Sequence, residues 1–161
     1  MGSDCTLEID GGLVNLRVGA IIMKDGKFLM AGNSKMDYLY TVGGRIKFGE
    51  SAEKAVVREV FEETGVKMAV DRLGFVNENF FYCDLEANKG KLIYEILYFF
   101  YMKTPDDFEP VSMNFMEGES EEHLVWVDLN SDVHYYPEFF REELKKPVKH
   151  VKHILTDERY S

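Results

Sequence analysis

Apolar and polar positions along the first third of the chain predict a β-rich region that leads into a helix. Leu13–Met23 is apolar and β-branched with partial alternation, which is typical of a strand. Asp25-Gly26, in the polar turn that follows, is a strong short signal for a hairpin. Residues 1–12 are predicted to be a loose lead-in. The predicted strands of this region are 13–23, 28–31 and 38–42, with a turn at 24–27 and a loop at 32–37.

The remainder of the chain predicts further strands. Leu92–Met102 is strongly β-forming and is predicted to be a central strand, in a hairpin with the strand before it. That preceding strand region, 66–78, is expected as one or two pieces around Gly74. The acidic segment 116–123 is predicted to be a loop. The other predicted elements are a turn at 84–91, a loop at 104–110 and a last short strand at 124–127.

A second helix is predicted near the end of the chain. Pro137 suits the N1 position of a helix through Lys145, with Phe139, Phe140 and Leu144 facing inward. The tail, 148–161, is predicted to form another helical turn. This mixture of strands and helices favours an α/β or α+β fold. We find no repeat and no linker, so residues 1–161 are expected to form one domain.

The stretch between Ser51 and Gly65 predicts a helix with two distinct faces. Ser51 suits its N-cap and Gly65 the position after its end. At 100° per residue, one arc carries the apolar side chains that would face a core, namely Val56, Val57, Val60 and Phe61. A neighbouring arc carries three carboxylates, Glu59, Glu62 and Glu63, which repel one another. Either this arc is an acidic surface in solvent, or it binds a hard divalent cation, Mg²⁺ or Mn²⁺.

Charge and composition narrow the classes of function. The 161 residues carry a net charge of −10, from 19 basic and 29 acidic side chains. This balance argues against duplex nucleic acid as a partner, but a nucleotide neutralised by a cation is compatible with it. Cys5 and Cys83 form no zinc spacing and fit a reducing cytoplasm. There is no signal-peptide pattern and no apolar run of ~20 residues, so no membrane span is expected.

The stretch Gly44–Val66 resembles the Nudix box. The box requires Gly, five residues, Glu, seven residues, and then Arg-Glu-aliphatic-any-Glu-Glu-any-Gly-aliphatic. Every specified position matches, at Gly44, Glu50, Arg58, Glu59, Val60, Glu62, Glu63, Gly65 and Val66. One departure precedes the box, because Thr41-Val42 stands where many members have Leu-Pro. The loss of proline changes the stiffness of the loop but removes no ligand.

This resemblance implies both a fold and a reaction. The Nudix fold is an α/β/α sandwich with a mixed β-sheet, in which the box forms a loop, a helix and a loop. Its enzymes hydrolyse a pyrophosphate bond in a nucleoside diphosphate linked to another group. Metal ions neutralise the diphosphate and lower the pKa of a bound water. The resemblance leaves a homodimer open, and it leaves a nucleotide-sensing module without turnover as the alternative function.

The resemblance also implies roles for the box residues. Glu59, Glu62 and Glu63 correspond to the metal-binding carboxylates. Arg58 corresponds to the arginine that holds box carboxylates in place, and Glu50 to the glutamate that braces the loop through that arginine. The backbone of Gly44 is expected near the metal. The catalytic base stays open between a box glutamate and the acidic segment, whose candidates are Glu117, Glu119, Glu121 and Glu122.

Several residues outside the box are candidates for substrate binding. Arg17, Arg45 and Lys47 are placed to meet phosphates, with simple surface charge as the alternative. Glu95 interrupts an apolar strand, so it either needs a partner or metal, or faces solvent. Tyr82 lies 16 residues past the box, a weak marker of dinucleoside polyphosphate hydrolases in the family. The aromatic candidates for stacking on a base, or for core packing, are Tyr38, Tyr40, Phe80, Phe81 and Tyr82. The substrate stays open among nucleoside triphosphates, nucleotide sugars, ADP-ribose and dinucleoside polyphosphates.

Overall fold

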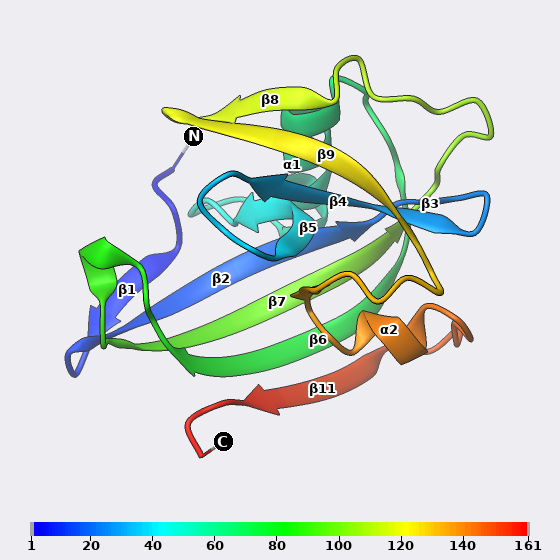
Figure 1. Ribbon diagram of the computed structural model, residues 1–161. Coiled ribbons are helices and arrows are strands. Elements are labelled where there is room, and N and C mark those ends of the chain that lie inside the picture. The colour runs from blue at the N-terminus through cyan, green and yellow to red at the C-terminus, as the bar shows by residue number, and fades with distance from the viewer. Residues whose placement is uncertain (1, 161) are drawn as a thin grey trace.

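A computed structural model describes residues 2–160 as a large curved sheet with helices on both sides (Figure 1). The strands of the first half are β1 Thr6–Ile9, β2 Gly12–Ile21, β3 Met23–Lys24, β4 Lys27–Asn33 and β5 Leu39–Arg45. They are followed by α1 Ala52–Thr64, β6 Val70–Tyr82, the 3-10 turn η1 Glu86–Asn88, and β7 Leu92–Met102. The chain ends with β8 Asn114–Glu117, β9 Ser120–Asp128, β10 Tyr135–Tyr136, α2 Phe140–Glu143 and β11 Lys152–Asp157.

The sheet is mixed, as expected for the fold. Its main order is β11-β6-β7-β2-β5-β4-β9-β8, and the shorter strands β1, β10 and β3 pair with β2, β5 and β4. β2 runs parallel to β7, and β11 runs parallel to β6, while β6 and β7 form the predicted antiparallel hairpin. The Asp25-Gly26 hairpin between β3 and β4 is also present. The predicted α/β/α architecture is confirmed.

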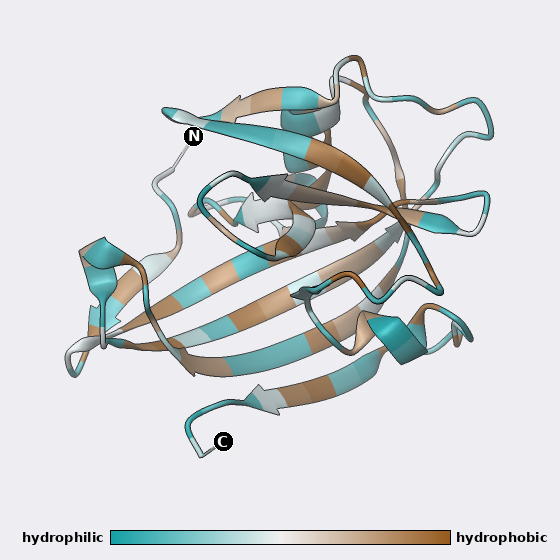
Figure 2. Ribbon diagram, in the orientation of Figure 1, coloured by the Kyte–Doolittle hydropathy of each residue, from teal (hydrophilic) through white to brown (hydrophobic). Residues whose placement is uncertain are grey.

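Two cores lie on opposite sides of the sheet. The core beneath α1 contains Val18 and Ala20 of β2, and Val56 and Val60 of α1. The other core is aromatic and includes Phe28, Phe75, Phe99, Tyr135 and Phe140. Figure 2 shows the alternation of apolar and polar bands along β2, β6 and β7 that this two-sided burial requires. Consecutive residues of β2 therefore point toward different sides of the sheet.

The predicted loose lead-in, 1–12, is wrong. Residues Thr6–Ile9 form β1, which pairs antiparallel with the start of β2. The turn between them contains Asp10 and Gly11, both with positive φ, at 50° and 77°. This is a second Asp-Gly hairpin signal, but the strand that it follows is only four residues long. So short a segment has little periodicity of its own and is specified by its pairing.

The prediction for the C-terminal region is partly wrong. The tail forms strand β11 along the edge of β6, where a helical turn was predicted. α2 covers only Phe140–Glu143, and Pro137 lies before it, after a cis peptide bond, so it is not at N1. Phe140 and Leu144 are nevertheless buried, and Phe139 packs against the same core, as predicted. No helix among residues 2–160 is long and apolar enough to cross a membrane.

The acidic segment 116–123 is a hairpin and not the predicted loop. β8 and β9 meet at a tight turn, in which Gly118 has φ 61°. β9 is also longer than the predicted strand 124–127, because it starts at Ser120. The region around Gly74 is one strand, β6, with a shift in register between Leu73 and Phe75. Acidic side chains hide the alternation of β9, since its polar residues outnumber its apolar ones at the start.

Candidate active site

The helix α1 begins and ends where its sequence indicates. The Ser51 hydroxyl accepts a hydrogen bond from the Lys54 N–H at 3.2 Å, and Gly65 adopts the left-handed conformation with φ 76°. Ala55, Val56 and Val60 are completely buried against the sheet. Phe61 does not join them: it is 55% exposed, so its predicted core position is wrong. The buried arc is rotated away from Phe61 and toward the carboxylates Glu59 and Glu63.

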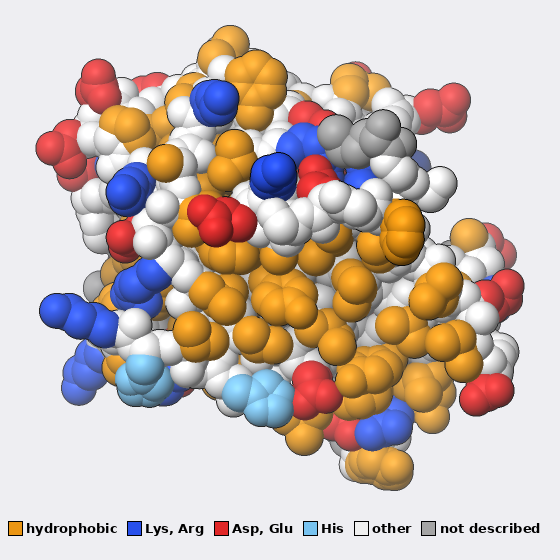
Figure 3. All heavy atoms as spheres, turned by 180° about the vertical axis from the view of Figure 1, so that it is seen from behind, with side chains coloured by type: hydrophobic (Ala, Val, Ile, Leu, Met, Phe, Trp, Pro, Cys, Tyr) orange, Lys and Arg blue, Asp and Glu red, His pale blue; other side chains and the backbone are white. Residues whose placement is uncertain are grey.

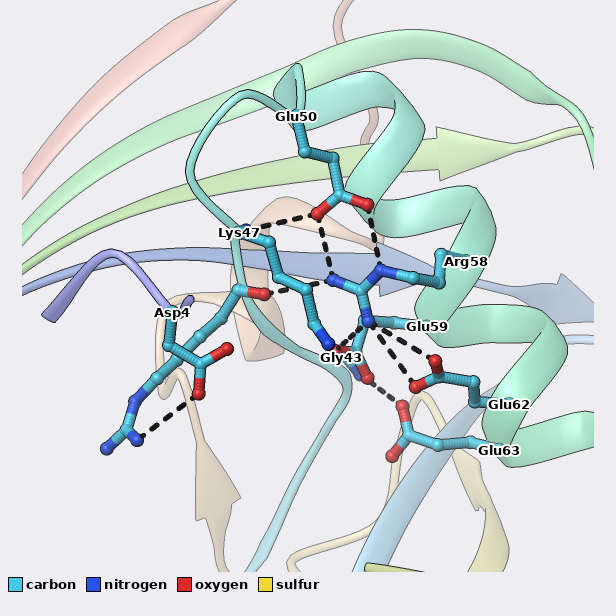
Figure 4. Close-up of polar contacts among 9 residues, drawn as sticks. Asp4, Gly43, Lys47, Glu50, Arg58, Glu59, Glu62 and Glu63 are labelled. Atoms are coloured by element: carbon cyan, nitrogen blue, oxygen red, sulfur yellow. Dashed lines mark hydrogen bonds and ion pairs between the residues drawn. The ribbon is translucent and has the colours of Figure 1, made fainter. Parts of the chain in front are cut away.

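Arg58 joins the helix to the loop that precedes it (Figure 4). Its Nε and Nη2 donate to the two oxygens of Glu50 at 2.8 and 2.9 Å, and Nη2 also donates to the Arg45 carbonyl at 3.1 Å. Glu50 accepts a further hydrogen bond from the Lys47 N–H at 3.1 Å. These bonds lower the pKa of Glu50 and raise that of Arg58. Both groups are therefore held charged, and the loop is fixed to one face of α1.

Glu59 is a buried carboxylate that lies close to Gly44 of β5. Its side chain receives a hydrogen bond from Arg58 Nη1 at 2.9 Å on Oε1, while its buried Oε2 has no hydrogen-bond partner. Burial is the main cause that raises its pKa to about 7. A Cβ on Gly44 would stand 2.5 Å from Oε1, so only glycine allows the carboxylate this close to β5. The predicted proximity of Gly44 to the ligand set therefore has a steric basis.

Glu63 is the second buried carboxylate, with 5% exposure. It accepts a hydrogen bond from the Gly43 N–H at 2.8 Å, so α1 is bonded to β5 at the glycine next to the one that Glu59 approaches closely. Burial and the neighbouring Glu59 raise its pKa well above the ordinary value. The two neighbouring carboxylates, Glu59 and Glu63, both have raised pKa values, and Glu59 has an oxygen without a partner. A divalent cation between them would stabilise their ionised forms and bind that oxygen. This donor set fits Mg²⁺ or Mn²⁺, which prefer oxygen ligands.

Glu62 stands apart from the other two. Its side chain is half exposed and turned onto Arg58, with 3.4 Å between Oε2 and Nη1. Within residues 2–160, no three or more acidic, histidine or cysteine side chains are gathered in an arrangement that could hold a metal ion. The structure thus brings together two of the three predicted ligands, Glu59 and Glu63. Glu62 would have to leave Arg58 to join them.

A cavity of about 400 Å³ opens in front of these carboxylates. Its lining includes the three predicted phosphate-binding residues, Arg17, Arg45 and Lys47. The charge of Arg17 acts on Glu63, lowering its pKa against the larger effect of burial. Arg45 also pairs with Asp4 at 3.8 Å. A cavity lined by both carboxylates and cations suits a metal ion and the diphosphate that it would neutralise.

The acidic hairpin contributes two carboxylates to the cavity, Glu117 and Glu122. Burial, Glu62 and Glu122 raise the pKa of Glu117. Glu122 is buried and accepts a 2.6 Å hydrogen bond from the Tyr40 hydroxyl. Burial first, and then this bond, raise the pKa of Tyr40. The partnership of Tyr40 with Glu122 was not predicted, because the pair is separated by 82 residues. Glu122 lies two residues before the buried Leu124, so strand alternation is the signal that could have singled it out, and the acidic neighbours of Glu122 hide that signal.

Other candidates are not part of the cavity lining. Tyr82 is exposed and is not part of the lining, and Glu119 and Glu121 are also exposed outside it. Phe80 stacks on Tyr94, with 4.3 Å between ring centroids. Tyr38 forms an aromatic cluster with His134 and Tyr136. Glu95 is buried in β7, beside Asn15 and 4.0 Å from Arg17.

Comparisons with known proteins match most of the chain. A family model described as the NUDIX domain matches residues 14–150. A MutT-like protein from Streptomyces ambofaciens is 34% identical over 61 residues, which cover 38% of this chain and 40% of the length of that protein. A MutT protein from Bacillus halodurans has a similar structure, with a TM-score of 0.62, 18% identity, and coverage of 91% of this chain and 93% of that one. For an ADP-ribose pyrophosphatase from Streptococcus suis 89-1591, the TM-score is 0.55 and the identity 16%, over 88% of this chain and 98% of that one.

Proposed function

Because this chain belongs to the NUDIX domain family, we propose that it hydrolyses a pyrophosphate bond in a nucleoside diphosphate linked to another group. One observation carries the proposal. Two buried carboxylates, Glu59 and Glu63, border a cavity of about 400 Å³ whose lining also includes Arg17, Arg45 and Lys47. Carboxylates and cations facing one space would hold a metal ion and the phosphates that it neutralises.

We propose that Glu59, Glu62 and Glu63 bind Mg²⁺ or Mn²⁺, with the Gly44 backbone beside them. The bound ion would neutralise the diphosphate and lower the pKa of a water molecule. Arg58 is a positioning residue, because it fixes Glu59 and ties Glu50 to the helix. Arg17, Arg45 and Lys47 bind the phosphate oxygens. We do not propose Tyr82 as a binding residue, because Tyr82 is not part of the cavity lining.

We propose Glu117 as the general base. Of the four carboxylates in the acidic hairpin, only Glu117 and Glu122 line the cavity. Glu122 is already bonded to the Tyr40 hydroxyl, whereas no hydrogen bond or ion pair among residues 2–160 occupies the Glu117 carboxylate. Its raised pKa brings it closer to neutral pH, where a general base is most effective.

A screen of turnover tests this function. The chain is incubated with Mg²⁺ or Mn²⁺ and nucleoside triphosphates, nucleotide sugars, ADP-ribose and diadenosine polyphosphates. We expect one class to release a nucleoside monophosphate, and we expect the release to be lost in Glu63→Gln. The substrate class is then the one that is cleaved. Metal-dependent nucleotide binding without any turnover would favour the alternative, a nucleotide-sensing module.

We also propose a homodimer, formed through the part of the α1-side sheet face that the helix does not cover. Figure 3 shows this face as a broad apolar area. The side chains that share it include Leu7, Val14, Tyr94, Ile96, Tyr98 and Leu155. At ordinary strand spacing it measures roughly 20 Å by 20 Å, and exposed apolar patches of this size mark interaction sites. A second copy would supply an identical apolar face.

Sedimentation velocity tests the dimer. We expect the mass of two chains for the wild type and of one chain for Ile96→Asp. A monomeric wild type at micromolar concentration would contradict it.

For the location of the protein, we propose the cytoplasm, because Cys5 and Cys83 are free thiols.

A further inference from the structure

A row of polar side chains crosses the sheet next to the cavity. Cross-strand pairing places Thr6 opposite Asn15, Asn15 opposite Glu95, Glu95 opposite Asn79, and Asn79 opposite Thr156. Residues that are directly opposite share a face, so all five side chains lie on one face of β1, β2, β7, β6 and β11. It is the face turned away from the core beneath α1, because Leu16, Val18 and Ala20, which alternate with these positions along β2, pack in that core. We call these five residues the polar row.

The polar row continues directly from the cavity. Arg17 lines the cavity and lies two residues from Asn15 on the same face of β2. That spacing corresponds to roughly 7 Å along a strand. The guanidinium Nε of Arg17 is also 4.0 Å from Oε1 of Glu95. A ligand whose phosphates meet Arg17 would therefore extend its next part toward Glu95.

The polar row has more acceptors than donors to fill them. The Asn15 amide nitrogen donates to Glu95 Oε1 at a long 3.4 Å. Asn15 is 97% buried, and its Oδ1 has no hydrogen-bond partner; the buried Thr6 hydroxyl has none either. Within residues 2–160, no hydrogen bond reaches Oε2 of Glu95. Unpaired buried oxygens are costly, so Asn15 Oδ1 and the Thr6 hydroxyl favour a ligand that brings donors. Oε2 of Glu95 is not among the fully buried unpaired atoms, so it is open to the same ligand.

We propose that the polar row selects the base of the substrate, and that Glu95 binds a base with two adjacent donors, as guanine has. This inference rests on the proposed nucleotide function. An ionised carboxylate has two oxygens and no proton to donate. It therefore matches the neighbouring N1–H and N2–H groups of guanine. Adenine and cytosine present an acceptor beside their amino group, and that acceptor is repelled by the carboxylate. The two hydroxyls of a ribose are the other source of paired donors, and the experiment separates them from the base.

Equilibrium binding of nucleoside monophosphates tests the proposal. These ligands contain no pyrophosphate bond, so the result does not depend on turnover. Calorimetry compares GMP, IMP, AMP and 2′-deoxyGMP. IMP lacks only the 2-amino group, and 2′-deoxyGMP lacks only the 2′-hydroxyl. We expect GMP to bind the wild type about tenfold or more tightly than IMP and AMP, because each lacks one matched donor. We expect 2′-deoxyGMP to bind like GMP.

Glu95→Gln and a matched control complete the test. We expect Glu95→Gln to weaken GMP binding by about 10- to 100-fold and to remove the preference over AMP. Glu95→Asp, which keeps the charge, is expected to retain part of that preference. The control is Glu78→Gln, the same change on the opposite face of the sheet, and it is expected to bind GMP like the wild type.

Three outcomes overturn the proposal. Equal affinity of the wild type for GMP and AMP overturns the proposal. This comparison needs no variant, so it remains decisive even if Glu95→Gln does not fold. An unchanged GMP preference in Glu95→Gln would mean that the polar row is only structural. Loss of affinity with 2′-deoxyGMP, rather than with IMP, would assign Glu95 to the sugar. An enzyme that turns over nucleotides without base preference would keep the proposed function while this inference fails.

Discussion

Arg58 holds Glu50 with two parallel hydrogen bonds, Nε to Oε2 at 2.8 Å and Nη2 to Oε1 at 2.9 Å. Both side chains are largely buried, at 15% and 8% exposure. The same guanidinium reaches Glu59 through Nη1. One residue therefore fixes the loop, the helix and a carboxylate of the candidate metal site.

Arg58→Lys should disrupt both the fold and the site. A lysine keeps the charge but cannot form two parallel bonds with Glu50 and also reach Glu59. Removal of one partner of a buried ion pair lowers the free energy of unfolding by about 3–5 kcal/mol. Because lysine keeps the positive charge, we expect a loss of about 3 kcal/mol or less. We expect urea unfolding to show this loss, and turnover to fall with it. Arg159→Lys is the control, because Arg159 makes a similar paired contact with Asp157 at the edge of the sheet. Equal turnover in Arg58→Lys and the wild type would contradict the positioning role.

Glu59→Gln and Glu63→Gln should weaken metal binding directly. Each change removes a negative charge from the two buried carboxylates, while the size of the side chain stays the same. We expect Mn²⁺ titration followed by electron paramagnetic resonance to show affinity reduced at least about 10-fold for each variant. Glu53→Gln is the control, since Glu53 is an exposed glutamate on the first turn of the same helix. Wild-type Mn²⁺ affinity in both test variants would remove these carboxylates from the ligand set.

Gly44→Ala tests the close approach of β5 to Glu59. The added Cβ would stand 2.5 Å from the carboxylate, so Glu59 must move. We expect the protein to fold, with Mn²⁺ affinity and turnover both reduced. A variant with normal Mn²⁺ affinity would show that the position of Glu59 is not limited by the missing Cβ.

The metal-free protein should lose stability as the pH rises through the acid range. Burial raises the pKa of Glu59 from 4.5 to about 7, so the folded state holds its proton to higher pH than the unfolded state. Its contribution to the free energy of unfolding is complete below pH 4.5, falls up to about pH 7, and is then constant. Urea unfolding in chelator should show this slope, and Glu59→Gln should reduce it. A slope unaffected by Glu59→Gln would argue that other groups cause it.

The sequence was informative wherever local spacing decides the structure. Arg58, Glu59 and Glu63 share a helix, so their relative positions follow from 3.6 residues per turn. Phe61 lies at one edge of the predicted apolar arc and is exposed. Burial continues instead past the other edge of the arc, onto Glu59 and Glu63. Helical periodicity alone cannot choose between these two edges of an arc.

Long-range pairing accounts for what the sequence could not predict. β1 and β11 become strands through their neighbours β2 and β6, and neither segment has a pattern long enough to indicate this. The bond of Tyr40 to Glu122 and the pairing of Asn15 with Glu95 depend on the register of strands that are about 80 residues apart. A one-residue change in register would reverse the face of every such side chain.

Glu117→Gln should separate chemistry from metal binding. If Glu117 accepts the proton of the attacking water, the variant keeps Mn²⁺ affinity within a few-fold and loses kcat by about 10²- to 10⁴-fold. The wild type should show a fall in kcat at acidic pH, because the base must be ionised, and the raised pKa of Glu117 moves that fall toward neutral pH. Glu119→Gln is the matched control, an exposed glutamate in the turn of the same hairpin. Rates and pH profiles of Glu117→Gln that match this control would transfer the role of base to a glutamate of the box.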